Sequence, residues 1–215
     1  MSERSAEHLI WIDLEFTTLD PAAGFIMQAA MIVTTRDLVP LPPPGIAPEV
    51  GGLLYDVQLS ADQAATASEW VRQNQRDQLA RSQGELAVSV DRVEDLFMGY
   101  LLHFCEVPEA IRERPLLAGN SVHGDRRYLE VHMPRLTRLM SFRQLDVTTI
   151  KELARRWAPA LEFNKNAETI RRWYPSAIEV EGGAHDALFD IKGSVAELNF
   201  YRNHLFVPGA RGEAE

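Results

Sequence analysis

The chain has 215 residues, of which 46% are hydrophobic and 25% charged, and its formal net charge is −9. This length and composition predict one globular domain, and no run of about 18 apolar residues indicates a membrane-spanning helix. The acidic balance disfavours binding of long nucleic acids, which needs a basic groove, but it permits a substrate with only one or two phosphates.

The chain ends and the cysteine content indicate a cytoplasmic protein. Residues 1–8 are polar and lack the apolar middle section of a secretory signal, so we expect a short flexible N-terminus and a cytoplasmic location. Residues 207–215 are expected to form a flexible tail, which leaves 9–206 as the folded domain. The only cysteine, Cys105, excludes an internal disulfide and lies in an apolar stretch, so it is expected to fill the core.

Apolar runs and turn residues predict a mixed α/β order of elements. Strands are expected over 9–15, 25–35, 51–59, 116–119 and 144–147. Helices are expected over 61–82, 91–105, 127–139, 151–157 and 187–204, and Thr148 or Thr149 is expected to cap the fourth of them. Prolines in segment 39–48 indicate a loop that protrudes from a hairpin. Three strands followed by alternating helices and strands predict an α/β fold with a mixed sheet.

Four acids stand at positions that could bring them together. Asp13 and Glu15 are two apart at the end of a buried strand and therefore project from one face, although they could simply lie in solvent there. Asp125 follows the turn after the fourth strand, where it could lie over the end of that strand or cap a helix. Asp190 lies near the start of the last helix, where it could equally be a surface acid.

One histidine lies close to the last of these acids in the sequence. His185 follows Gly182 and Gly183 and precedes Asp190 by five residues. Beside an acid-rich site, such a histidine could take a proton from an attacking water, although alone it would be read as a surface histidine. Asp186 is expected to cap the last helix rather than bind a metal.

The ordered set of acids suits hydrolysis of a phosphodiester by two divalent cations. Two cations about 3.5–4 Å apart can clamp the attacking and the leaving oxygen. Carboxylate oxygens are the ligands that Mg²⁺ and Mn²⁺ prefer, and four of them balance the charge of two such ions. Zinc is disfavoured because the sequence has no cluster of cysteines and histidines. Asp13, Glu15, Asp125 and Asp190 are therefore predicted metal ligands, with His185 as the general base.

These residues resemble the DEDD exonucleases in their histidine-bearing branch. Over nearly the whole chain the sequence resembles oligoribonuclease, especially in the segments 9–20, 119–129, 145–157 and 185–206. The resemblance implies a ribonuclease H-like fold and a homodimer that degrades very short single-stranded RNA, including dinucleotides, from the 3′ end to 5′-mononucleotides.

The resemblance also implies roles for residues outside the predicted metal site. Leu19 would wedge between two bases, and Trp70 would line the base pocket. Ser121, Arg143 and Thr148 would cap the 5′ phosphate and exclude longer chains, which suits an arginine with hydroxyl partners. Phe142 would reach the partner's active site.

The sequence departs from the family pattern at four positions. Thr18 stands where the family has glycine, Gln28 where it has glutamate, Gln75 where it has histidine and Phe142 where it has tyrosine. Two alternatives remain open beside the family's activity. One is a single-stranded DNA exonuclease of proofreading type, and the other is a non-catalytic module that binds nucleotides.

Overall fold

Five strands form one mixed sheet with the order β3-β2-β1-β4-β5. The computed structural model describes residues 4–183 and 185–206, so parts of both predicted flexible ends, residues 1–3 and 207–215, lie outside it. β1 pairs antiparallel with β2 and parallel with β4, so the mixed sheet is confirmed. The bounds of the strands are Leu9–Phe16 (β1), Ile26–Thr34 (β2), Leu53–Asp56 (β3), Leu116–Gly119 (β4) and Gln144–Asp146 (β5).

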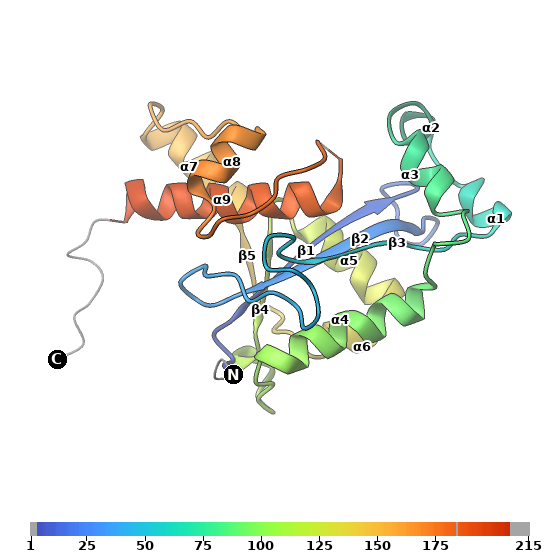
Figure 1. Cartoon of the computed structure of the whole chain (residues 1–215), viewed down its shortest axis with the longest axis horizontal. Helices are drawn as coiled ribbons and strands as arrows, with labels where there is room; N and C mark the ends of the chain where they lie inside the picture. Colours follow the sequence, from blue (N-terminus) through green and yellow to red (C-terminus); the bar gives the residue numbers. More distant parts are fainter. Residues whose placement is uncertain (1–3, 184, 207–215) are drawn as a thin grey trace.

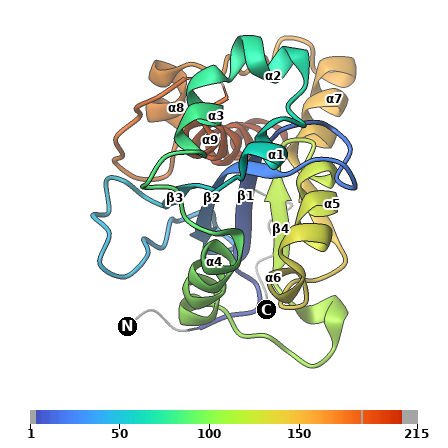
Figure 2. The same cartoon turned by 90° about the vertical axis from the view of Figure 1, so that its right-hand side faces the viewer.

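Helices cover both faces of this sheet, as Figures 1 and 2 show. One layer consists of α4 (Val90–Phe104), α5 (His123–His132) and α6 (Pro134–Thr137). The opposite layer consists of α7 (Val147–Trp157), α8 (Ala167–Trp173) and the long α9 (Ala187–Leu205). A 3₁₀ turn, Ile111–Glu113, precedes β4. The predicted α/β class is thus confirmed, and β1 and β2 lie in the core between the layers.

Three short helices form a separate small cluster near the start of β2. They are α1 (Ala61–Ala64), α2 (Glu69–Asn74) and α3 (Arg76–Arg81), and apolar side chains from them pack with Met27. The prediction of one helix over 61–82 was wrong because caps interrupt it. The Ser60 side chain forms a capping box at α1, and the Ser68 side chain accepts the Val71 N–H and begins α2.

The structure also differs from the predicted elements in the second half of the chain. The helix predicted over 127–139 begins earlier, at His123, and is divided at Met133 because Pro134 cannot continue it. α7 is capped by the Asp146 side chain, which accepts the Thr148 N–H, and not by a threonine. α8 was not predicted, although the Asn166 side chain caps it. Cys105 is buried in the core, as expected.

Among the helices of residues 4–183 and 185–206, none combines the length and the apolar character that a membrane-spanning helix needs.

Candidate active site

The carboxyl end of β1 carries two acids on the side of the sheet that α9 covers. Leu9 and Trp11 pack in the core beneath α9. Because side chains alternate along a strand, Asp13 and Glu15 continue that row as β1 leaves the core. Glu15 is 9% exposed, and its carboxylate accepts a hydrogen bond from the side-chain amide of Gln75 at the end of α2. These acids are therefore largely withdrawn from water rather than solvated, so the surface interpretation of them was wrong.

Asp125 reaches the same end of β1 from the opposite layer. It lies in the first turn of α5, and its Oδ1 accepts the backbone N–H of Leu14 at 3.0 Å. β4 pairs with β1 only up to Trp11, so the strand edge beyond that point is left for this contact. The alternative that Asp125 caps the helix was wrong, because the N-cap residue is Val122 and its side chain accepts no hydrogen bond.

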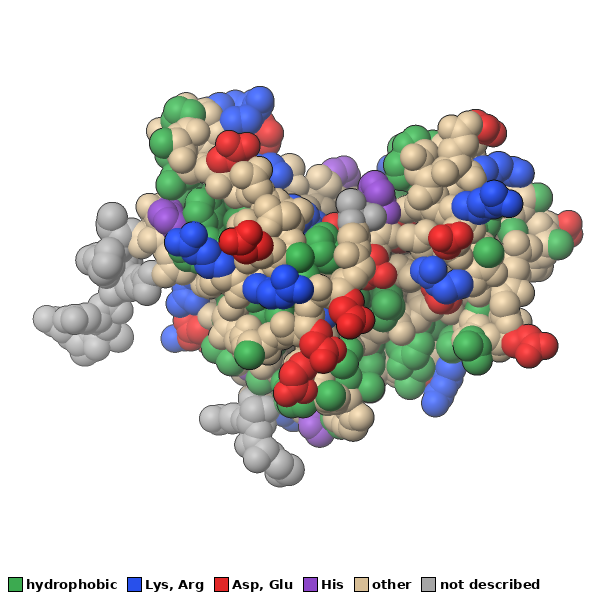
Figure 3. Space-filling view, turned by 45° about the horizontal axis from the view of Figure 1, so that its top comes forward, with side chains coloured by type: hydrophobic (Ala, Val, Ile, Leu, Met, Phe, Trp, Pro, Cys, Tyr) green, Lys and Arg blue, Asp and Glu red, His purple; other side chains and the backbone are tan. Residues whose placement is uncertain are grey.

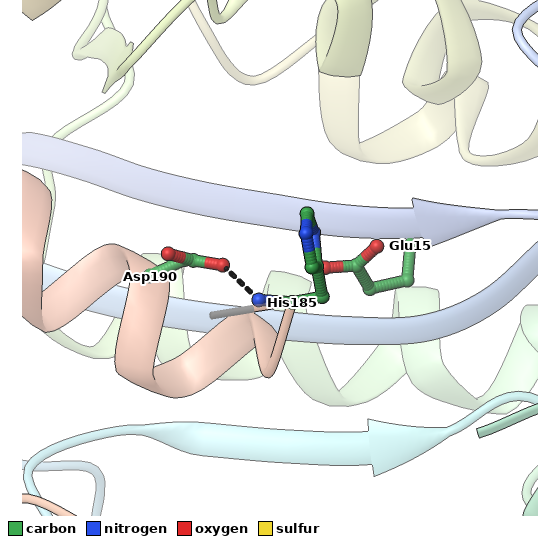
Figure 4. Close-up of side chains that lie close together, drawn as sticks. All are labelled: Glu15, His185 and Asp190. Atoms are coloured by element: carbon green, nitrogen blue, oxygen red, sulfur yellow. Dashed lines mark hydrogen bonds between the residues drawn. The ribbon is translucent and has the colours of Figure 1, made fainter. Parts of the chain in front are cut away.

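The segment that enters α9 supplies the remaining acid and the histidine. The backbone N–H of His185 donates to Asp190 Oδ2 at 2.9 Å, which Figure 4 shows together with Glu15. One ligand atom each of Glu15, His185 and Asp190 lies within 4.8 Å of the others. Asp186 caps α9 by accepting the Phe189 N–H, as expected. Asp190 is only partly exposed and faces this cluster, so it is not a free surface acid.

The backbone at His185 adopts an unusual conformation that its contacts hold. Its φ is +70°, in the left-handed region that side chains other than glycine and asparagine seldom occupy. The carbonyl of His185 accepts a hydrogen bond of 2.6 Å from the Gln78 side chain of α3. Its ring meets the Trp70 ring edge-on, with 5.1 Å between centroids. The helices α2 and α3 therefore help to hold the histidine over the acids.

The neighbouring acids affect the ionisation of Asp13. Burial raises the pKa of Asp13 well above its ordinary value, and the charges of Asp125, Asp190 and Glu15 raise it further. The positive charge of Lys165 opposes this rise. These charge effects indicate that Asp13 lies near the other three carboxylates, which come from β1, α5 and α9. Such a group is costly to ionise without a cation.

Two further carboxyl pKa values show the same cost. Burial raises the pKa of Glu15 to about 8, although the hydrogen bond from Gln75 lowers it and neighbouring acids add to it. Burial raises the pKa of Asp125 to about 7, against the lowering effect of the Leu14 N–H. A cation bound among these oxygens would remove the cost, because it favours the ionised form of each ligand.

These pKa values predict that the metal-free protein loses stability as the pH rises. Each group binds its proton more tightly in the folded state, so its contribution is complete below its unfolded pKa and is lost as the pH passes its folded pKa. For Glu15 that window runs from its ordinary value of 4.5 to about 8. We expect the free energy of unfolding in chelator, measured by denaturant titration, to fall from pH 5 to pH 8.

The variant Glu15→Gln checks the source of that pH dependence. It keeps the shape of the side chain but cannot ionise, so its stability should fall less steeply over the same pH range. A metal-free protein that is as stable at pH 8 as at pH 5 would contradict the arrangement of buried acids.

A cavity of about 550 Å³ opens beside the acids. The surface in Figure 3 is hollowed between a part formed by α7 and α8 and a part formed by α1–α3. Glu15 and His185 form part of the cavity wall, and Trp70 and Leu19 form an apolar part of it. Leu19 is 82% and Trp70 50% exposed. Both predicted base-contacting residues therefore lie next to the acids.

A second cavity contains only part of the predicted phosphate cap. The hydroxyls of Ser121 and Thr148 lie 3.2 Å apart and both line it. Arg143 is not among its lining residues, and its guanidinium lies 5.7 Å from the centre of the Phe142 ring. Phe142 itself is 65% exposed. The structure thus brings the two hydroxyls together and places Arg143 with Phe142 instead.

Several residues near the site were not predicted from the sequence. His123 lines the second cavity beside Ser121 and Thr148. Lys165 lies 2.8 Å from Asp190 in an ion pair. Gln28, the neutral residue at a position where the family has an acid, pairs with Glu15 across β1 and β2 and accepts the Ala187 N–H at the start of α9. Neither His123 nor Lys165 follows a recognisable motif, so neither was predicted as a site residue.

Individual known sequences resemble this chain over nearly its whole length. No protein-family model matches the chain. An oligoribonuclease of Pseudomonas syringae pv. tomato is 37% identical over 206 residues, which cover 95% of this chain and 99% of that protein. Oligoribonucleases of Aeromonas hydrophila and Leifsonia xyli are 35% and 36% identical, over 94% and 97% of this chain and 97% and 90% of theirs.

Comparison with solved structures supports the fold. Cell-death related nuclease 4 has a TM-score of 0.59 at 16% identity and covers 94% of this chain, which spans 66% of that protein. The zinc-bound complex of E. coli exonuclease I with single-stranded DNA has a TM-score of 0.61 at 13% identity, over 94% of this chain and 41% of that one. The predicted ribonuclease H-like fold is thereby confirmed.

Proposed function

This chain belongs to the oligoribonuclease family, a family of nucleases, and we propose that it hydrolyses very short single-stranded RNA to 5′-mononucleotides with two divalent cations. Its activity as a 3′→5′ exonuclease follows from the family. The observation that carries the finer proposal is the meeting of four carboxylates and His185 at the end of β1. A module that only binds nucleotides would gain nothing from this costly group of acids.

The donor set fits divalent cations that prefer oxygen. Asp13, Glu15, Asp125 and Asp190 would hold them, because positive charge would relieve the cost of ionising Asp13, Glu15 and Asp125, whose pKa values burial raises. When bound, the cations would polarise the phosphodiester and lower the pKa of the attacking water. Zinc suits this site less well, since His185 is the one nitrogen donor in its cluster.

The protein's own contribution is to position a base and to select the substrate. We assign proton abstraction to the His185 ring, which faces the acids while its backbone is fixed by Asp190 and Gln78. The cavity wall formed by Leu19 and Trp70 offers apolar surface for two bases. Gln75 holds Glu15 by its amide and so takes the place of the family's histidine without a titrating group.

Selection of short substrates would come from the residues that bind the 5′-phosphate end of the RNA. Ser121 and Thr148 offer two neighbouring hydroxyls, and Asp146 fixes both residues by accepting their backbone N–H groups at 2.9 Å. An exposed Arg143 would have to turn from Phe142 to join them. A terminal phosphate carries more charge than an internal one and accepts hydrogen bonds from several directions. A longer RNA would have to continue past its phosphate, where it would collide with the residues that line this pocket.

Assembly as a homodimer belongs to the same proposal. The exposed Phe142 ring and the guanidinium of Arg143 form one apolar and cationic projection from the loop before β5. Such a projection suits contact with a partner's site better than contact with water, since a large exposed ring gains by burial.

Graded substrates test the proposed specificity. We expect the kcat/KM of the wild-type protein on a 5′-phosphorylated RNA dinucleotide to exceed that on a seven-residue RNA by about ten- to a hundredfold, because each charged hydrogen bond lost is worth about 1.5–3 kcal/mol. The matching DNA dinucleotide shows whether the 2′-hydroxyl matters. Product release is followed over time with labelled RNA and DNA.

Arg143→Ala provides the matched variant for this test. It should lose most of the advantage of the dinucleotide and change the rate on the seven-residue RNA much less. Equal rates of the wild type on both lengths would leave the exonuclease activity standing and overturn the proposed phosphate cap. Preference for long single-stranded DNA would favour the alternative of a DNA exonuclease.

A further inference from the structure

A lysine is built into the group of acids. Lys165 Nζ lies 2.8 Å from Asp190 Oδ1, and the two side chains are 30% and 17% exposed. Its charge also lowers the pKa of Asp13, so its effect extends beyond the acid that it contacts. The other oxygen of Asp190 accepts the N–H of His185. Both oxygens of Asp190 therefore have a donor from the chain itself.

The backbone that carries Lys165 is fixed on both sides. Phe163 is buried and its ring lies 5.7 Å from that of Phe200 on α9. Asn166 caps α8, with its side chain accepting the Thr169 N–H at 3.0 Å. A lysine on a free loop would lose both backbone and side-chain entropy in forming this ion pair. Here packing already fixes the backbone, so only the side-chain entropy is lost.

Gly193 makes the path of the lysine side chain possible. A Cβ atom added to Gly193 would come within 2.2 Å of Lys165 Cε, 2.9 Å of Cγ and 3.1 Å of Cδ. The side chain therefore lies flat across α9, one turn beyond Asp190. A glycine inside a helix is unfavourable by itself, so close passage of a side chain is a physical reason for its presence here.

We propose that Lys165 is an internal counter-cation of the acid group, which neutralises Asp190 in the metal-free protein and is displaced from it when a divalent cation binds. This inference rests on the proposed metal site. A divalent cation bound at Asp190 would lie close to the ammonium group and be repelled by it, so the two compete for this carboxylate. The competition weakens cation binding, while the ion pair keeps the metal-free protein folded despite its crowded acids.

Binding of Mn²⁺ measured by calorimetry tests the competition without any measurement of turnover. We expect Lys165→Gln to bind Mn²⁺ about three- to tenfold more tightly than the wild type, in line with one partly exposed charge pair. Its melting temperature in chelator should be lower than that of the wild type. Lys165→Arg should stay close to the wild type in both measurements.

Two further variants separate charge from position. Gly193→Ala leaves every charge in place but pushes Lys165 off Asp190, so it should also tighten Mn²⁺ binding. Arg155→Gln removes a positive charge that lines the same cavity as Lys165 but pairs with Glu152 instead, so its Mn²⁺ affinity should stay within about twofold of the wild type.

The outcomes distinguish this inference from the proposed function. Absence of Mn²⁺ uptake by the wild type would overturn the metal site itself. Uptake by the wild type with unchanged affinity in Lys165→Gln would make the ion pair merely structural and overturn the inference. Weaker binding in Lys165→Gln would also overturn it, because the lysine would then hold Asp190 in place for the cation rather than compete with it.

Discussion

Replacement of Asp13 by Asn is expected to lower kcat by about a thousandfold or more, since it would remove one proposed ligand from a site in which bound cations would supply most of the charge stabilisation. The same change should raise the melting temperature of the metal-free protein. Burial and three neighbouring acids make the ionised form of Asp13 unfavourable, and asparagine removes that charge without changing the shape. Turnover of an RNA dinucleotide and thermal unfolding in chelator measure the two effects.

Asp186→Asn is the matched control for that experiment. It also removes one negative charge close to the acids, but asparagine can still cap α9 by accepting the Phe189 N–H. Its activity should stay within a few-fold of the wild type. Turnover by Asp13→Asn within about tenfold of the wild type would contradict the metal-site assignment, because loss of a cation ligand costs far more than that.

Strong local signals in the sequence predicted the elements that build the site. Residues 9–12 form an unbroken apolar run that leads into two acids, and this run begins β1. The segment 116–119 is bounded by Pro115 and the turn at Asn120, and it forms β4. Weak or competing signals misled the prediction elsewhere. Residues 61–82 lack an apolar face, so the caps at Ser60 and Ser68 decide their structure.

The same contrast holds for the site. The order and spacing of Asp13, Glu15, Asp125 and Asp190 predicted their convergence. The contacts of Glu15, Asp125 and Asp190 agree with it, whereas the role of the four acids as ligands stays a prediction. Nothing in the sequence around Lys165 indicates its ion pair, because the contact depends on how α8 packs against α9. The glycine inside the last helix was the one available signal, since such a residue suggests close approach by another group.

Arg143, the arginine proposed to bind the 5′ phosphate, shows another limit of prediction from the sequence. A family pattern can name a residue, but the rotamer of an exposed arginine depends on the ligand or partner that is present. In the described chain its guanidinium lies near Phe142, while Ser121 and Thr148 are fixed by the backbone and by Asp146. Short polar side chains next to a helix terminus are thus placed by the fold, whereas a long exposed one is not.

Removal of the His185 ring is expected to lower kcat by about a hundred- to ten-thousandfold, the range for loss of a general base. His185→Gly is the suitable variant, because the φ of +70° at this position is free of strain for glycine. Both backbone contacts, to Asp190 and from Gln78, can then remain. Added imidazole should restore part of the activity by entering the space beside Trp70 that the ring occupied.

The same variant decides between a base and a ligand. His185 has a ring nitrogen within 4.8 Å of ligand atoms of Glu15 and Asp190, so a direct bond to a cation is a real alternative. If His185 acts as the base, His185→Gly should bind Mn²⁺ with an affinity within about twofold of the wild type, because the four carboxylates remain. A loss of affinity of more than about a hundredfold would make His185 a ligand, since removal of a partner that only supports a ligand costs about 10–100-fold. Unchanged kcat would remove it from the reaction altogether.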